Sequence, residues 1–82
     1  MKLTVLYFAA VRDLVGKDEE VLDVPAAVAT VGLLGTHLAA IHPELEGRLG
    51  YVRFARNEEF AAGSDALAEG DVLALIPPVA GG

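Results

Sequence analysis

The chain has 82 residues, enough for one compact core and too few for two domains. Its 12 acidic and 6 basic residues give a formal net charge of −6, which repels phosphate backbones and anionic membranes, so neither nucleic acid nor lipid is an expected partner. The absence of cysteine excludes a disulfide framework, a thiolate nucleophile and a Cys-ligated zinc. No secretory signal is recognisable, which makes a cytoplasmic location the default expectation.

The amino-terminal segment is rich in β-branched and aromatic residues, which predicts a strand over residues 2–8. One face of this strand carries Leu3, Val5 and Tyr7. A short helix is expected over residues 9–15, with Gly16 as a left-handed residue that ends it. The charged cluster 17–20 is expected to be a solvated turn that leads into a second strand over residues 21–24, paired with the first as a hairpin.

The main helix is predicted over residues 31–41, with Thr30 as its cap and Pro43 as its boundary. Its apolar residues recur at spacings of three, four and three and form one stripe, made of Val31, Leu34, Leu38 and Ile41. Gly32 and Gly35 interrupt this helix, and each should cost about 1 kcal/mol relative to alanine unless a close backbone approach requires it. Residues 24–43 lack charged side chains and, at about 20 residues, could span a bilayer, but an amphipathic helix of a soluble domain explains them better.

Strands are also predicted over residues 51–55, 59–61 and 72–76, separated by turns. The last of them is a near-continuous apolar run, typical of a central strand, and Pro77 and Pro78 end it. The order strand, strand, helix, strand, strand, strand indicates an α+β domain with a mixed sheet crossed by one main helix. Seven residues are expected in its core: Leu3, Val5, Leu34, Leu38, Ile41, Leu73 and Leu75.

Conventional active-site motifs are missing from the sequence. His37 and His42 are five positions apart, which does not place them on one helix face, so they are interpreted as structural histidines and no metal site is expected. Ser64 is the only serine and lies in a turn without a catalytic frame. The acidic pairs at 19–20 and 58–59 are expected at solvated edges. The glycines form no nucleotide-binding motif.

The carboxyl-terminal segment is different. It consists of Pro77, Pro78, Val79, Ala80, Gly81 and Gly82. Two prolines stiffen the exit from the last strand, and two glycines remove every side chain near the terminal carboxylate, so such a tail can enter a narrow tunnel. The alternative is a frayed terminus without a role.

Three stretches of the sequence resemble the small subunits of molybdopterin synthase. They are the ending 69–82, with its Pro77-Pro78-Val79-Ala80-Gly81-Gly82 signature, the start 5–16, and the segment 52–60 with its Asn57-Glu58 turn. The resemblance therefore covers nearly the whole chain. It departs at Gly32 and Gly35, where residues that favour helices would be expected.

The resemblance implies a ubiquitin-like β-grasp domain over residues 1–76 and a flexible tail over residues 77–82. It also implies that a separate adenylating enzyme uses ATP to activate Gly82, and that sulfur from a donor enzyme then converts Gly82 to a thiocarboxylate. The tail, from Pro77 to Gly81, would thread into the large synthase subunit, within a heterotetramer, and sulfur would be donated there to a pyranopterin precursor of the molybdenum cofactor. The small chain itself would bind no cofactor and supply no catalytic acid or base.

The outer faces of the first and last predicted strands carry apolar side chains where a solvated face would be polar, namely Leu6, Phe8, Ala74 and Ile76. We interpret them as a docking patch for a partner protein. A second small core under residues 9–15 is the alternative.

Two other functions fit the sequence. A ubiquitin-like modifier, joined to protein lysines through Gly82, uses the same fold and the same activation. A plain interaction domain would need no tail chemistry. The sulfur carrier of thiamine synthesis is a close relative, but the segment 77–79 and the apolar segment 6–8 fit it less well.

Overall fold

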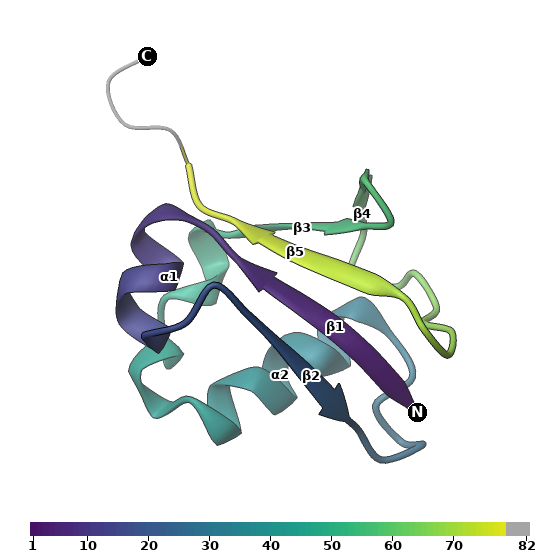
Figure 1. The fold of residues 1–82 in the computed structure, drawn as a ribbon. Coiled ribbons are helices and arrows are strands. Elements are labelled where there is room, and N and C mark those ends of the chain that lie inside the picture. Colours follow the sequence, from purple (N-terminus) through teal and green to yellow (C-terminus); the bar gives the residue numbers. More distant parts are fainter. Residues whose placement is uncertain (79–82) are drawn as a thin grey trace.

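Five strands form one mixed sheet, in the order β2-β1-β5-β3-β4, in the computed structural model, which describes residues 1–78 (Figure 1). The elements are β1 (Lys2–Tyr7), α1 (Ala9–Val15), β2 (Glu19–Asp23), α2 (Val31–Ile41), the 3₁₀ turns η1 (Pro43–Leu45) and η2 (Leu49–Tyr51), β3 (Arg53–Arg56), β4 (Glu59–Ala61) and β5 (Val72–Ile76). The central strands β1 and β5 are parallel, and the other neighbours are antiparallel. With α2 crossing one face, this is the ubiquitin-like β-grasp fold expected from the sequence.

The predicted hairpin of β1 and β2 is confirmed, but β2 begins earlier than expected. Glu19 and Glu20 belong to the strand and pair with Leu6 and Val5, so they are not part of a solvated turn. The polar side chains of residues 17–20 favoured a turn in the prediction. Strand pairing is made by backbone hydrogen bonds, which polar side chains do not prevent. Gly16 has φ +84° and ends α1 as predicted.

The main helix α2 has the predicted bounds. The side chain of Thr30 accepts a hydrogen bond from the amide of Leu33 at 3.2 Å, which satisfies one of the free amides of the first turn. The helix ends at Ile41 after 11 residues, just before Pro43. Within residues 1–78, no helix has the length and apolar character needed to cross a membrane.

The core lies between α2 and the sheet face that it covers. Six of the seven predicted core residues are fully buried, namely Leu3, Val5, Leu34, Leu38, Leu73 and Leu75. The prediction for Ile41 is wrong, since its side chain is 41% exposed. Ile41 lies in the last turn of the helix, and Leu45 of the following η1 turn is buried in the core instead.

The two helix glycines have different surroundings. A Cβ on Gly32 would lie 3.1 Å from the carbonyl oxygen of Gly63, so this position does face a close backbone approach. Gly32 and Val31 donate backbone hydrogen bonds to Gly63 and Asp65, and the loop thereby satisfies free amides at the start of α2. Gly35 faces only the side chains of Phe54 and Leu49, at ordinary contact distances.

Candidate functional site

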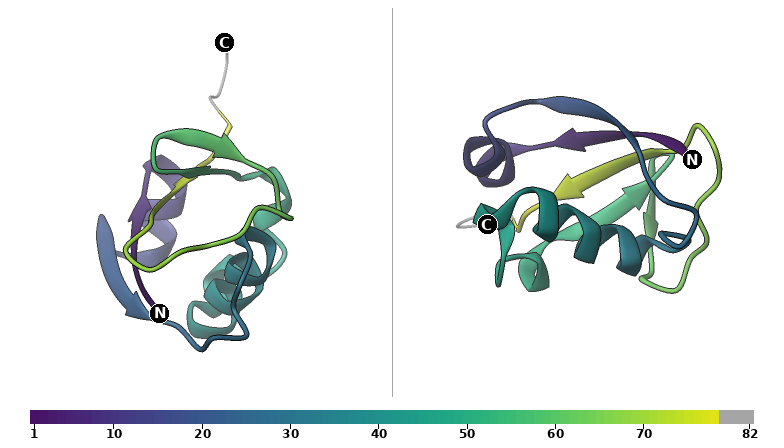
Figure 2. Two further views of the ribbon diagram at one scale, coloured as in Figure 1. Left: turned by 90° about the vertical axis from the view of Figure 1, so that its right-hand side faces the viewer. Right: turned by 90° about the horizontal axis from the view of Figure 1, so that it is seen from below.

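The sheet has a second face, which α2 does not cover (Figure 2). We call it the outer face and define it by its apolar residues, which are Leu6, Phe8, Ala55, Phe60, Val72, Ala74 and Ile76. These side chains line a shallow groove of about 450 Å³, with Asn57 and Glu58 at its border. Phe8 is 46% exposed and Phe60 is 59% exposed. An apolar surface with two exposed aromatic rings is typical of a protein-binding site.

The register of the strands builds the outer face. Leu6 lies beside Ala74 in the parallel pair of β1 and β5, and Ala74 lies opposite Ala55 of β3. Ala55 in turn lies opposite Phe60 of β4, so one apolar row crosses four strands. Side chains at paired positions project to the same face of a sheet, which explains the continuity of this row.

All four residues that the sequence assigned to a docking patch lie together in this groove: Leu6, Phe8, Ala74 and Ile76. The alternative, a second small core under residues 9–15, is wrong. Val11 of α1 is buried in the main core, and Leu14 and Val15 pack against it. The exposed outer face therefore stays without a cover among residues 1–78.

Three members of the outer face were missed from the sequence, namely Ala55, Phe60 and Val72. Alternation along β5 could have included Val72, because it lies two residues before Ala74. Phe60 could not be placed in this way, since its position depends on the pairing of β3 with β4. The aromatic ring at the far edge of the groove is thus a product of sheet topology.

The tail predicted to carry the chemistry begins at one end of the outer face. Strand β5 ends at Ile76, and Pro77 follows as a half-buried residue and Pro78 as an exposed one. The remaining predicted tail residues, Val79, Ala80, Gly81 and Gly82, lie outside the described residues. The division into a domain over residues 1–76 and a tail over residues 77–82 stays a prediction.

Asp71 holds the turn between β3 and β4 against the start of β5. Its carboxylate accepts hydrogen bonds from Arg56 Nε at 2.6 Å, Asn57 Nδ2 at 2.9 Å and the amide of Ala68 at 2.8 Å. Asn57 also accepts a hydrogen bond from the amide of Val72 at 2.9 Å. The turn residues Asn57 and Glu58 have φ of +50° and +72°, so this network holds an uncommon backbone conformation that returns the chain into β4.

The environment of Asp71 favours its ionised form. Burial alone raises the pKa of this carboxyl, but the hydrogen bonds from Asn57, Arg56 and Ala68 and the charge of Arg56 together hold it below its ordinary value. The side chain of Asp71 is 7% exposed, so an uncompensated charge there would be costly. Sequence reasoning placed Asp71 only in a turn and missed this role.

A second polar network links β1, β2 and the end of α2. Tyr7 donates a hydrogen bond of 2.6 Å to Glu20 Oε1, which also lies 2.5 Å from Nε2 of His42. Lys17 contributes a bond of 3.3 Å to the other carboxylate oxygen, and Nδ1 of His42 lies 3.5 Å from Glu44. The interpretation of His42 as a structural histidine fits these contacts, whereas the expected solvated role of Glu20 is wrong.

The network also shifts two pKa values. Burial, together with the hydrogen bond and the negative charge of Glu20, raises the pKa of the Tyr7 hydroxyl, which therefore stays a donor. Burial raises the pKa of Glu20 as well, but the hydrogen bonds from Tyr7, His42 and Lys17 outweigh it and lower the pKa overall. These groups join elements of the fold and lie away from the groove of the outer face.

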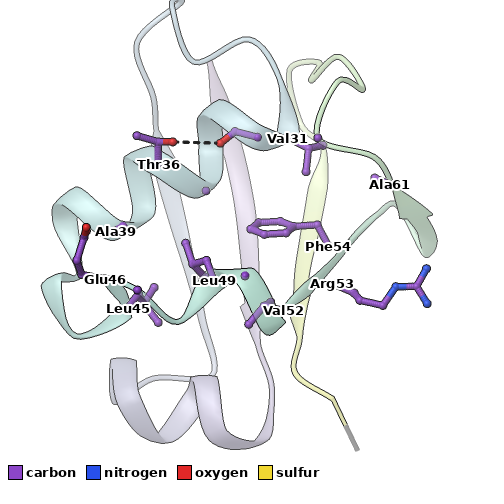
Figure 3. Close-up of a pocket in the computed structure, with 15 residues that line it drawn as sticks. Val31, Thr36, Ala39, Leu45, Glu46, Leu49, Val52, Arg53, Phe54 and Ala61 are labelled. Carbon is purple, nitrogen blue, oxygen red and sulfur yellow. Dashed lines mark hydrogen bonds between the residues drawn. The ribbon is translucent and has the colours of Figure 1, made fainter.

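A larger cavity, of about 660 Å³, lies between α2 and the segment that leads into β3 (Figure 3). Gly32 and Gly35 contribute no side chains to it, and Phe54 projects towards α2. Thr36 donates a hydrogen bond of 3.4 Å to the carbonyl oxygen of Gly32, within its wall. In the part of the chain that the structure describes, no three His, Cys, Asp or Glu side chains gather in a way that could hold a metal ion.

Comparison with known proteins gives a family for the chain. The model of the ThiS family matches residues 5–82. The chain is 38% identical to the molybdopterin synthase sulfur carrier subunit of Chlamydomonas reinhardtii, over 100% of both chains. It is also 38% identical to the subunit of the same name from Escherichia coli, over 98% of this chain and 99% of the other.

A likeness of similar strength leads to another group. The chain is 39% identical to small archaeal modifier protein 1 of Haloferax volcanii, over 92% of this chain and 94% of the relative. A crystal structure of that modifier covers 100% of both chains with a TM-score of 0.87, at 36% sequence identity. Because the family model and full-length relatives agree with the fold, the chain belongs to the ThiS family.

Proposed function

We propose that this chain is a sulfur carrier of molybdenum cofactor biosynthesis and acts as the small subunit of a molybdopterin synthase. The observation that carries the proposal is the family match, which extends through the double glycine at 81–82, together with full-length relatives named as molybdopterin synthase sulfur carrier subunits. The apolar outer face beside the start of the tail supports it. A cytoplasmic location, where the partner enzymes of such a carrier would act, is part of the proposal.

The working group in this proposal is the carboxylate of Gly82. A terminal carboxyl has a reference pKa of roughly 3.3 to 3.7, so near neutrality it is an anion and a poor electrophile. A separate adenylating enzyme would use ATP to form an acyl-adenylate and release pyrophosphate. The terminal sulfur of a donor-enzyme persulfide would then displace AMP at the carbonyl carbon and form an acyl disulfide. A second thiol would cleave its S–S bond, forming a disulfide with the donor cysteine and leaving a thiocarboxylate on Gly82.

The large subunit of the synthase would receive the charged tail. The sulfur of Gly82 would be transferred there to a pyranopterin precursor, and the small chain would supply no acid or base. Glycine at positions 81 and 82 has no Cβ that could clash with a channel around the backbone. In this arrangement the outer face provides affinity, and the segment from Pro77 to Gly81 provides reach.

The test compares intact protein with two tail variants, by mass spectrometry after incubation with the activating enzyme, ATP and a sulfur donor. Wild type should gain the mass difference between oxygen and sulfur. Deleting Gly82 moves the carboxylate back by about 3.3 to 3.6 Å, and reacting atoms must approach within roughly 3 to 3.5 Å, so this variant should stay unmodified. Gly81→Val should also stay unmodified, because its side chain would clash with the channel in which the activating enzyme receives the tail. Sulfuration of the shortened chain at the rate of wild type would refute the mechanism.

A protein modifier is the second candidate, and the likeness to small archaeal modifier protein 1 favours it. A modifier would form an isopeptide bond between Gly82 and a lysine of another protein. Both activities need Gly82 and its activation, so the tail variants alone do not separate them. Expression of the tagged chain in its native host would separate the two activities. Conjugates to lysines of other proteins that vanish when Gly82 is deleted are expected only of a modifier.

A further inference from the structure

We infer that Arg53 binds a side-chain carboxylate of the large synthase subunit docked on the outer face, and that this ion pair orients that subunit around the start of the tail. The inference rests on the proposed function and adds the chemistry by which the partner is recognised. It is carried by the position of Arg53, by its contact with Phe60, and by the distribution of charge over the described residues.

Arg53 stands at the end of the outer face from which the tail leaves. It is the first residue of β3 and lies directly opposite Ile76, the last residue of β5. Residues directly opposite each other in an antiparallel pair project to the same face, so the side chain of Arg53 emerges beside Ile76, next to Pro77. Arg53 borders the cavity beneath α2, and Figure 3 shows its side chain at the margin of that cavity, pointing away from Phe54.

The guanidinium group of Arg53 is held in place by an aromatic ring. Its carbon Cζ lies 3.7 Å from the centroid of the Phe60 ring, a cation–π contact. A guanidinium that covers a ring keeps its N–H donors around its edge, and these match the two oxygens of a carboxylate. Because the stacking already restricts the side chain, less rotamer freedom is lost when an anion binds.

The charged surroundings of Arg53 differ from those of Arg12, Lys17 and Arg56. Arg12 lies near Asp13 and Asp18, Lys17 pairs with Glu20, and Arg56 pairs with Asp71. Among residues 1–78, no carboxylate lies within salt-bridge distance of Arg53. Lys2 and Arg48 likewise have no carboxylate partner within these residues, but of the three only Arg53 is stacked on an aromatic ring of the outer face. A chain with a net charge of −6 thus holds a cation without a described carboxylate partner against Phe60.

The contact with Phe60 decides what the partner must bring. Phe60 is an apolar anchor of the outer face, and a partner that covers its ring also covers the guanidinium stacked on it. Burying a charge without a counter-ion is unfavourable, so the partner needs an anion at this point. A side-chain carboxylate of Asp or Glu fits, because it belongs to the docked protein and accepts both N–H bonds. The rest of the partner's surface has to suit a strongly acidic chain. A single acidic group opposite Arg53 would therefore fit in only one orientation of the docked protein.

The experiment measures the affinity of the full chain for the large synthase subunit by isothermal titration calorimetry. Arg53→Gln should raise Kd by tenfold or more, and Arg53→Lys should give a smaller increase because it keeps the charge but loses the planar fork. Arg48→Gln is the matched control, since Arg48 is exposed and changes the net charge equally but, unlike Arg53, is not stacked on Phe60 of the groove. We expect Arg48→Gln to change Kd by less than twofold. Melting temperatures of all variants exclude unfolding as the cause.

A charge-reversal series identifies the carboxylate itself. Arg53→Glu should bind more weakly than Arg53→Gln, and one Asp→Arg or Glu→Arg change in the large subunit should restore its binding. Equal effects of Arg53→Gln and Arg48→Gln, with wild type binding normally, would overturn this inference alone. Failure of wild type to bind the large subunit would overturn the proposed function and the inference with it.

Discussion

The backbone of Gly32 lies directly against that of Gly63. The Gly32 amide donates a hydrogen bond of 2.9 Å to the Gly63 carbonyl oxygen, and a Cβ on Gly32 would lie 3.1 Å from the same oxygen. This contact fastens the loop before β5 to the first turn of α2. One of the two glycines that weaken the helix is therefore needed for tertiary structure.

The glycine pair in α2 gives a first prediction. Gly35→Ala should stabilise the domain by about 0.5 to 1 kcal/mol, because its methyl group meets only the side chains of Phe54 and Leu49 at ordinary distances. Gly32→Ala gains the same helix propensity but must displace the loop, so it should be the less stable variant of the two. Urea unfolding of both variants checks this order, and a more stable Gly32→Ala would contradict the reading of the contact.

Core substitutions separate the correct members of the predicted core from the wrong one. Leu75→Ala should cost about 2 to 5 kcal/mol, because this side chain is fully buried. Ile41→Ala is the control and should cost clearly less, since Ile41 is partly exposed at the helix end. Chemical denaturation measures both. Equal losses would mean that Ile41 belongs to the core after all.

Stability should fall in acid partly through Asp71. The pKa of this carboxyl is lowered in the folded state from an ordinary value of 3.8, so its contribution is present above that value and is lost as the pH falls through the folded pKa. Asp71→Asn should lower stability at pH 7, by on the order of 2 kcal/mol, and should make its decline from about pH 5 to pH 2 shallower. Unfolding titrations at several pH values test this. Glu20→Gln should likewise make the decline of stability in acid shallower, because the pKa of Glu20 is also lowered in the folded state.

Docking on the outer face should depend on its exposed apolar side chains. Phe8→Ala and Ile76→Arg should weaken binding to the large subunit or the activating enzyme, with little change in stability, because neither residue belongs to the core cluster. Tyr51→Ala is the control, since Tyr51 is more exposed than Phe8 but lies outside the groove. Lowered melting temperatures with unchanged affinity would show a core role instead. Binding should also weaken with added salt, because the chain is strongly acidic.

The sequence by itself determined the class of the fold, most of the core and the family. Alternation with period two along a strand and the apolar stripe of the helix show which side chains share one apolar face. They directly predict the core positions of Leu3, Val5, Leu34 and Leu38. The cap at Thr30 also follows, because capping depends on neighbours in the chain. The tail signature is local too, although the role of Gly82 remains a prediction.

Only the tertiary structure decided which distant residues meet. Pairing of β3 with β4 and β5 places Phe60 and Arg53 on the outer face, and no local pattern contains that register. The same holds for Glu20, whose charge suggested solvent, because its partners Tyr7 and His42 lie on other elements. Local periodicity fixes the face on which a side chain lies, whereas its contacts across the sheet depend on strand order and register, which are properties of the folded chain.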